Sequence, residues 1–149
     1  MQILIDADAC PVKEETYKVA ARYKVPVVVI SNSPIRVPLD PLISRKVVSD
    51  AFDATDDWIV EHAGLGTVVI TADILLADRC LKLGATVIAP NGKLFTSSSI
   101  GSAIAMRAIM SDLRAGGDSV GGPPPMRNAD RSGFLSSLDE ALVKLRRQS

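Results

Sequence analysis

The sequence is poor in aromatic residues, cysteine and long apolar runs, and each shortage excludes a class of protein. Aromatic residues make up only 4% of the 149 residues, so the chain lacks the stacking platform that single-strand nucleic-acid binders use. The two cysteines, Cys10 and Cys80, have no paired zinc spacing and predict reduced thiols in a cytoplasmic protein. The longest apolar runs, such as residues 25–30, are far shorter than the roughly 20 residues that span a bilayer, so no membrane partner is expected.

The chain also has no net charge, because 17 basic residues balance 17 acidic ones. The two signs are nevertheless unevenly distributed. Residues 1–78 contain 12 acidic and 7 basic side chains, whereas residues 79–149 contain 5 acidic and 10 basic ones. This split is either incidental surface patterning or an acidic centre beside a basic surface for a polyanion. The zero balance itself argues against a broad nucleic-acid footprint.

Apolar runs of strand length alternate with amphipathic helical segments along most of the chain. Strands are expected at residues 2–6, 25–31, 46–52, 67–71 and 86–89, and helices at 11–23, around Trp58, at 73–83, from 98 or 99 to about 114, and at 131–147. Runs that are apolar on both faces and separated by helices are typical of a parallel sheet covered on both sides. We therefore predict an α/β protein, a three-layer α/β/α sandwich with a mainly parallel sheet of about five strands.

One domain is expected over residues 1–149. A stretch rich in glycine and proline breaks the pattern, and we expect residues 116–130 to form a loop. The helix predicted at 131–147 has one apolar stripe, which indicates that it docks on the sandwich.

Acidic residues follow three of the predicted strands. They are Asp6 and Asp8 after the first strand, Asp53, Asp56 and Asp57 after the third, and Asp73 and Asp78 after the fourth. The carboxyl ends of parallel strands meet at one edge of the sheet, where ligands bind. Carboxylates gathered there repel one another, and a hard divalent cation such as Mg²⁺ or Mn²⁺ relieves that repulsion. Such an ion suits phosphodiester hydrolysis, although Asp56 or Asp73 taken alone could instead cap a helix.

Basic and polar residues complete the predicted site. Arginine and lysine side chains bind phosphate groups, and hydroxyl or amide groups orient substrate or water. The expected substrate-binding residues are Lys13, Arg36 and Arg107, acting as a group with Arg45, Lys46, Arg114 and Arg131, together with the hydrogen-bonding side chains of Asn32 and Thr71.

Several motifs, in this order and spacing, resemble the YaiI/YqxD family of uncharacterised bacterial proteins. They are Asp6-Ala-Asp-Ala-Cys-Pro11, Arg36-Val-Pro38, Phe52-Asp-x-x-Asp56, Val69-Ile-Thr-Ala-Asp73 with Leu76-Ala77, Gly122-Pro123, and Asp130-Arg131 with Phe134. The resemblance covers nearly the whole chain. That family is grouped with PIN-like domains, whose members are commonly metal-dependent ribonucleases with an α/β/α sandwich.

The resemblance also implies roles for single residues. Asp6 is similar to the acid that closes the first strand of PIN-like domains, Asp56 to the acid that starts a central helix, and Asp73 to the acid after the fourth strand. Together with Asp8 these residues would hold the metal and activate water, and Asp53 would be a supporting ligand. PIN nucleases also place a glutamate in an early helix, to which neither Glu14 nor Glu15 is assigned. RNA as the partner rests on the resemblance alone, and a homodimer is left open.

Two other functions remain open from the same residues. Asp6-x-Asp8 after a strand resembles the first motif of haloacid-dehalogenase-type phosphatases, and residues 28–32 resemble their second strand end. In that reaction Asp6 would be the nucleophile that takes the phosphoryl group, with Asp8 as the general acid–base. The third hypothesis is a non-catalytic PIN-like module that binds nucleic acid or protein.

Overall fold

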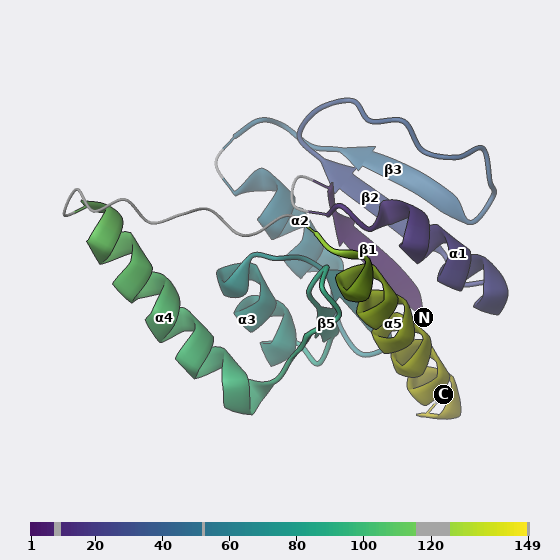
Figure 1. Ribbon diagram of the computed structural model, residues 1–149. Helices are drawn as coiled ribbons and strands as arrows, with labels where there is room; N and C mark the ends of the chain where they lie inside the picture. The colour runs from purple at the N-terminus through teal and green to yellow at the C-terminus, as the bar shows by residue number, and fades with distance from the viewer. Residues whose placement is uncertain (8–9, 52, 116–125, 149) are drawn as a thin grey trace.

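The computed structural model describes residues 1–7, 10–51, 53–115 and 126–148; for residues 107–115 only the backbone is described. Its centre is a six-stranded sheet with the order β3-β2-β1-β4-β5-β6 (Figure 1). The strands are β1 Gln2–Asp6, β2 Val27–Ser31, β3 Ile43–Val47, β4 Thr67–Ile70, β5 Thr86–Ile88 and β6 Leu94–Phe95. The first five are parallel and β6 is antiparallel to β5, which confirms the predicted mainly parallel sheet and adds one strand.

Five helices cover the sheet and make the three-layer α/β/α sandwich (Figure 1). They are α1 Lys13–Tyr23, α2 Ala54–His62, α3 Ile74–Lys82, α4 Ser97–Ala115 and α5 Asn128–Gln148. Side chains from α1 and α5 pack on one face of the sheet, and those from α2, α3 and α4 pack on the other. No helix in the described ranges has both the length and the apolar content that crossing a bilayer requires.

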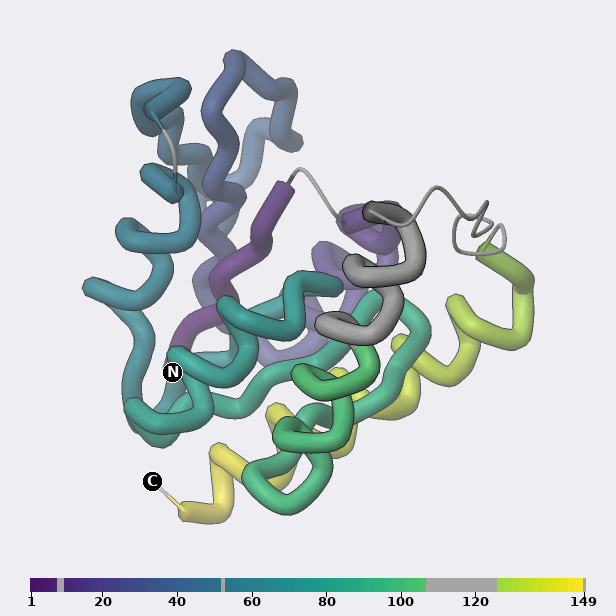
Figure 2. Tube along the Cα trace, turned by 90° about the vertical axis from the view of Figure 1, so that its left-hand side faces the viewer, coloured from purple at the N-terminus to yellow at the C-terminus, as the bar shows by residue number. Residues whose placement is uncertain are grey.

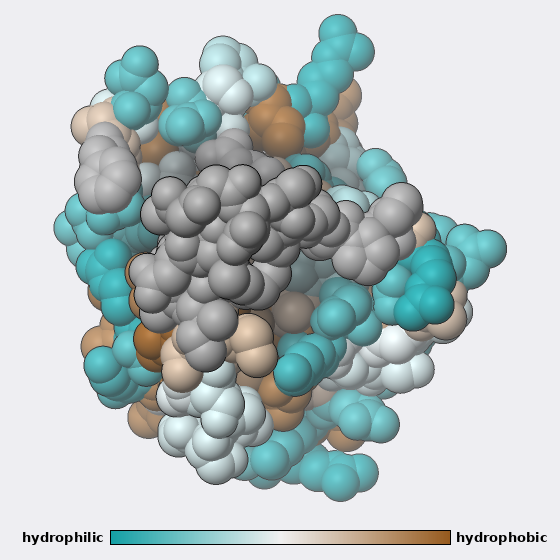
Figure 3. Space-filling model, turned by 60° about the vertical axis from the view of Figure 1, so that its left-hand side comes forward, coloured by the Kyte–Doolittle hydropathy of each residue, from teal (hydrophilic) through white to brown (hydrophobic). Residues whose placement is uncertain are grey.

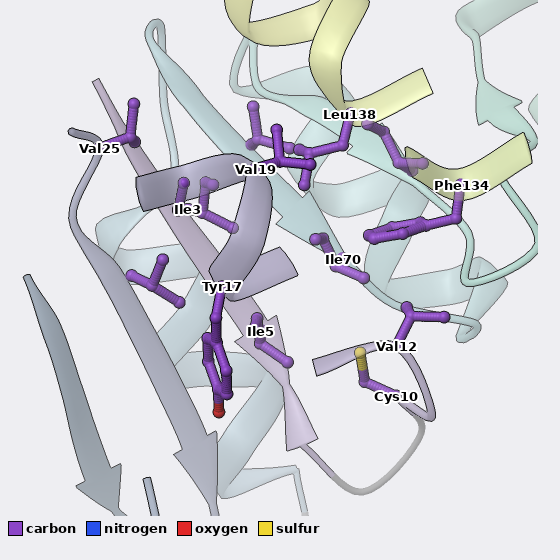
Figure 4. Close-up of a cluster of buried hydrophobic side chains, with 14 of the residues drawn as sticks. Ile3, Ile5, Cys10, Val12, Tyr17, Val19, Val25, Ile70, Phe134 and Leu138 are labelled. Atoms are coloured by element: carbon purple, nitrogen blue, oxygen red, sulfur yellow. The ribbon is translucent and has the colours of Figure 1, made fainter. Parts of the chain in front are cut away.

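Alternation along the strands divides the core into two clusters. Ile3 and Ile5 of β1 point to the α1 and α5 face, whereas Leu4 between them points to the α2 and α3 face. Figure 4 shows the first cluster, in which Phe134 and Leu138 of α5 lie over Ile70. Because both faces bury apolar side chains, the central strands carry the continuous apolar runs that are typical of a covered parallel sheet.

The β5–β6 hairpin fixes the position of α5. Its turn, at Pro90-Asn91-Gly92, contains Gly92 at φ +90°, a left-handed conformation that favours glycine. A Cβ atom at Gly92 would lie 2.5 Å from the carbonyl carbon of Gly133 in α5, so the two backbones touch. The hydroxyl of Ser137 also donates to the Gly92 carbonyl at 2.6 Å. The helix is therefore held against the hairpin at a distance that larger residues would prevent.

Two predicted elements had boundaries that were wrong by three residues or more. The third strand covers Ile43–Val47 rather than residues 46–52, because Val27 of β2 pairs with Ile43 and the apolar residues that follow Val47 lead out of the sheet toward α2. The last helix begins at Asn128 rather than Arg131, since the Asp130 carboxylate accepts a hydrogen bond from the Arg127 N–H and stabilises an earlier start. The predicted loop residues 116–125 lie outside the described part.

Candidate functional site

The order of the strands reverses beside β1. From β1 the chain crosses through α1 to β2 and continues to β3, and it then returns through α2 to β4 on the other side of β1. In open parallel sheets the crevice at such a reversal, beyond the carboxyl ends of the strands, is the usual ligand site. Asp6 is the last residue of β1 and Thr71 directly follows β4. Both therefore lie at the position where this fold binds ligands.

A buried hydroxyl connects the ends of these two strands. Thr71 is fully buried and Asp6 is 6% exposed. The Thr71 hydroxyl donates to Oδ2 of Asp6 at 2.9 Å and accepts the backbone N–H of Asp73 at 3.0 Å. The pairing of Ile5 with Ile70 places Asp6 level with Thr71 on the face that carries Leu4. The hydroxyl thus holds the Asp6 carboxylate and the start of α3 in a fixed relation.

Asp73 is the N-cap of α3. Its Oδ1 accepts the backbone N–H groups of Leu75 at 2.9 Å and Leu76 at 3.2 Å, which satisfies two of the free donors at the helix start. The capping role considered in the sequence analysis is therefore present. It uses one carboxylate oxygen, and the described residues provide no hydrogen bond to Oδ2 of Asp73.

Asp53 and Asp56 come from the start of α2. Asp53 is the N-cap residue, at φ 61° and ψ 11°, and its side chain makes no capping hydrogen bond. A left-handed conformation is uncommon for a residue other than glycine, although aspartate adopts it more readily than most. Asp56 lies in the first turn, half-buried. Capping therefore does not account for the Asp53 carboxylate.

The four carboxylates are coupled by charge. Burial, followed by repulsion from Asp73, Asp6 and Asp53, raises the pKa of Asp56 from 3.8 to about 6. Arg79 of α3 has the opposite effect on this pKa. We call Asp6, Asp53, Asp56 and Asp73, together with Thr71, the carboxylate edge. The site as it stands disfavours negative charge on Asp56, the condition that a bound cation would relieve.

The carboxylate edge is not a ready-made metal cage. Within the described ranges, no three histidine, cysteine or acidic side chains converge closely enough to hold an ion. Asp8, a predicted ligand, lies outside the described residues. The donors that are described are carboxylate oxygens, which fit Mg²⁺ or Mn²⁺ rather than a softer metal.

Arg79 is a neighbour of the carboxylate edge that sequence reasoning missed. Its guanidinium donates to Oδ1 of Asp57 at 3.0 Å, across the gap between α3 and α2. The two residues are 22 positions apart, so no local pattern indicated the pair. Both side chains are about half exposed, and a pair of this kind stabilises a protein by at most about 1 kcal/mol. For the site, the position of Arg79 beside Asp56 therefore matters more than the strength of its ion pair with Asp57.

The predicted substrate-binding residues are more dispersed. Asn32 and Arg36 are exposed in the segment that follows β2. Lys13 begins α1 on the opposite face of the sheet and donates its Nζ to the Cys10 carbonyl at 2.8 Å. The side chain of Arg107 is outside the described part. Of the predicted substrate-binding residues whose side chains are described, only Thr71 contacts a carboxylate of the edge.

Glu15 of α1 has a structural partner. Glu15 forms an ion pair with Arg131 of α5 at 3.1 Å, and Arg131 also donates to the Pro11 carbonyl. This pair joins α1 to α5 on the face away from Asp56.

Cys10 is buried, and burial raises the pKa of its thiol to about 11, so the thiol is protonated at neutral pH.

The surface around α2, α3 and α4 is mixed in character. In the space-filling view from that side, hydrophilic and hydrophobic residues alternate over the coloured surface (Figure 3).

Comparison with known proteins gives a consistent family match. The model of a family described as the uncharacterized YaiI/YqxD family matches residues 4–144. A UPF0178 protein of Sphingopyxis alaskensis is 66% identical over 146 residues, covering 97% of this chain and 95% of its own. UPF0178 proteins of Nitrobacter winogradskyi and Rhodopseudomonas palustris are 54% and 52% identical, each over 99% of this chain and 94% and 96% of their own. No solved structure matches the chain.

Proposed function

The chain belongs to the YaiI/YqxD family, and from its carboxylate edge we propose that it hydrolyses phosphodiester bonds in RNA with the help of Mg²⁺ or Mn²⁺. One observation carries the proposal. Carboxylates from the end of β1, the start of α2 and the start of α3 are coupled by charge at the reversal of strand order. Four neighbouring acids without a matching set of bases are difficult to explain by stability alone.

The residues that would hold the ion are Asp6, Asp56 and Asp73, with Asp8 and Asp53 in support. A bound divalent ion lowers the pKa of water and stabilises charge on a phosphoryl oxygen. Thr71 is a positioning residue, because its hydroxyl donates to Asp6 and so orients that carboxylate. The α3 amides hold Asp73 by Oδ1, which limits the rotation of its side chain.

Residues outside the carboxylate edge would contact the substrate. Arg79 lies beside Asp56 and could offer its charge to a phosphate group, at the expense of the exposed pair with Asp57. Asn32 and Arg36 follow β2 at the same end of the sheet and are exposed to solvent, which suits contacts with a polyanion. Lys13 and Arg107 remain in the proposal as members of the basic group. The preference for RNA over DNA rests on the resemblance to PIN-like domains.

The test is cleavage of labelled single-stranded RNA by the purified protein with Mn²⁺ or with EDTA. We expect cleavage only with the ion. In the Asp73→Asn variant the cleavage rate should fall at least ~10²-fold, since each 1.36 kcal/mol of lost transition-state stabilisation lowers the rate tenfold. Asparagine is as good an N-cap as aspartate, so this variant keeps the start of α3 intact. Asp57→Asn is the matched control, because Asp57 is a neighbour of Asp56 that does not contribute to its raised pKa.

A phosphomonoester assayed in parallel separates the alternatives. Release of phosphate without RNA cleavage, with phosphate trapped on Asp6, would replace the proposal with a phosphatase. RNA binding that survives both EDTA and Asp73→Asn, without cleavage, would instead indicate a binding module.

A further inference from the structure

An open groove lies at the end of the sheet opposite the carboxylate edge. It has a volume of about 760 Å³ and runs between α5 and the ends at which β1, β4 and β5 begin. The start of β1 and the end of α5 both lie at this end of the sheet (Figures 1 and 2). On α5 the groove is lined by residues three and four positions apart, including Glu140, Ala141 and Lys144, which form one stripe of the helix.

The rim of the groove carries large apolar side chains in water. Leu65 is 91% exposed, Leu94 46% and Met1 45%. Single exposed leucines are ordinary, but these three residues line the same groove. Leu65 projects into solvent from the groove wall, and a protein surface placed over the groove would cover all three side chains. The occupant is therefore expected to be a protein.

The charges on α5 indicate which protein. Glu140 and Lys144 are exposed, lie one helical turn apart and face the groove, and neither has an ion-pair partner among the described residues. Two α5 helices can pair antiparallel about a two-fold axis on the groove side, at the level midway between residues 140 and 144. In that pair, Glu140 of each copy meets Lys144 of the other. A patch that contains both signs in this arrangement is complementary to itself, as an isologous interface requires. The zero net charge of the chain also removes long-range repulsion between copies.

The wall of the groove is prepared for such contact. Phe134, Leu138 and Leu142 are fully buried on the inner side of α5, and the Gly92–Gly133 contact holds the helix against the β5–β6 hairpin. The outer stripe therefore has a fixed position before any partner binds, which lowers the entropy lost on association.

We propose that this groove is the interface of a homodimer, in which two α5 helices pair antiparallel and cover Met1, Leu65 and Leu94. The interface lies at the opposite end of the sheet from the carboxylate edge, so the dimer leaves both carboxylate edges open. The proposal does not depend on the proposed nuclease activity.

Sedimentation velocity over a range of protein concentrations tests the dimer. We expect a species of twice the 15.8 kDa monomer mass. Glu140→Lys and Lys144→Glu each place like charges opposite one another and should weaken the dimer at least about tenfold. The double variant, Glu140→Lys with Lys144→Glu, should restore it, because the two signs are exchanged in both copies. Lys18→Glu, an exposed reversal on α1, is the control that should leave the dimer unchanged.

The four charge variants concern exposed residues and should fold as the wild type does, which circular dichroism can check. A wild type that stays monomeric at every concentration would overturn the proposal. A dimer that tolerates both single reversals, or a double variant that remains monomeric, would also overturn it, since the helices then do not pair as described.

Discussion

The two ends of the sheet differ in what they leave unsatisfied. At the carboxyl ends of the strands, burial and the neighbouring carboxylates of Asp73, Asp6 and Asp53 raise the pKa of Asp56 to about 6. At the other end the charges on α5 are few and of both signs, and the unsatisfied groups are the apolar side chains of Leu65, Leu94 and Met1. The first end is suited to a cation and a polyanion, and the second to a protein surface.

This difference follows from the direction of the chain. All parallel strands end at the carboxylate edge, and helices α1, α2 and α3 begin there, so their N-terminal amides favour acidic side chains. Helices end at the opposite edge, which accounts for a basic residue such as Lys82 in the last turn of α3. The loops at that edge only join helices to the strands that follow them. Leu65, in the loop between α2 and β4, is therefore not required for the core. Placement of charge is thus built into the topology.

The largest expected effect separates the inner from the outer side of α5. Leu138→Ala should lower the free energy of unfolding by about 2–5 kcal/mol, because it opens a cavity in a fully buried cluster. Leu65→Ala at the rim should change it by about 0.5 kcal/mol or less when the protein is monomeric. Urea unfolding measured at low protein concentration checks both values. Equal losses in the two variants would show that the rim is part of the core after all.

A medium effect is expected at the hydroxyl that connects β1 to α3. Thr71→Val should lower the free energy of unfolding by about 1–3 kcal/mol, since it removes a buried donor to Asp6 and an acceptor for the Asp73 N–H. Thr71→Ser keeps the hydroxyl and should retain most of the stability. Thermal unfolding of the three proteins distinguishes these outcomes. If valine and serine behaved alike, the hydrogen bonds would not be what holds this end together.

The smallest effect concerns the pH dependence of the carboxylate edge. The pKa of Asp56 in the folded protein, about 6, lies above its ordinary 3.8, so the folded state holds the proton more strongly than the unfolded state. The contribution of Asp56 to stability should therefore fall as pH rises from about 4 to 6. Asp56→Asn should raise the Tm at pH 7. The gain in the free energy of unfolding should be about 1 kcal/mol or less, because the side chain is partly solvated. Near pH 4 the variant should be as stable as the wild type. A variant less stable than the wild type at pH 7 would contradict the repulsion among these acids.

Much of the fold could be predicted from local patterns. The strands that bury both faces, such as β1 and β4, are short apolar runs between helices, and their signal does not depend on distant residues. The strand β3 could not be located in this way. Four of its five residues are exposed, so its position depends on pairing with β2 and not on its own apolar content. Edge strands generally lack the pattern that identifies central ones.

The candidate site shows the same limit. That Asp6 and Asp73 follow strands was visible in the sequence, and parallel topology then requires them to share an edge. The ion pair of Arg79 with Asp57 and the pairing of Glu15 with Arg131 join residues far apart in the chain, and only the packing of helices onto opposite faces determined which acid gained a basic partner.

The sequence by itself determined the alternation of strands and helices, the location of the acids after the strands, and the family, because these depend on residue order and short-range periodicity. The tertiary structure decided that Thr71 meets Asp6, that burial and three neighbouring carboxylates raise the pKa of Asp56, and that Glu140 and Lys144 line a groove with Leu65. These relations depend on strand order and helix packing, which arise from the burial of the whole apolar surface at once and not from any single segment.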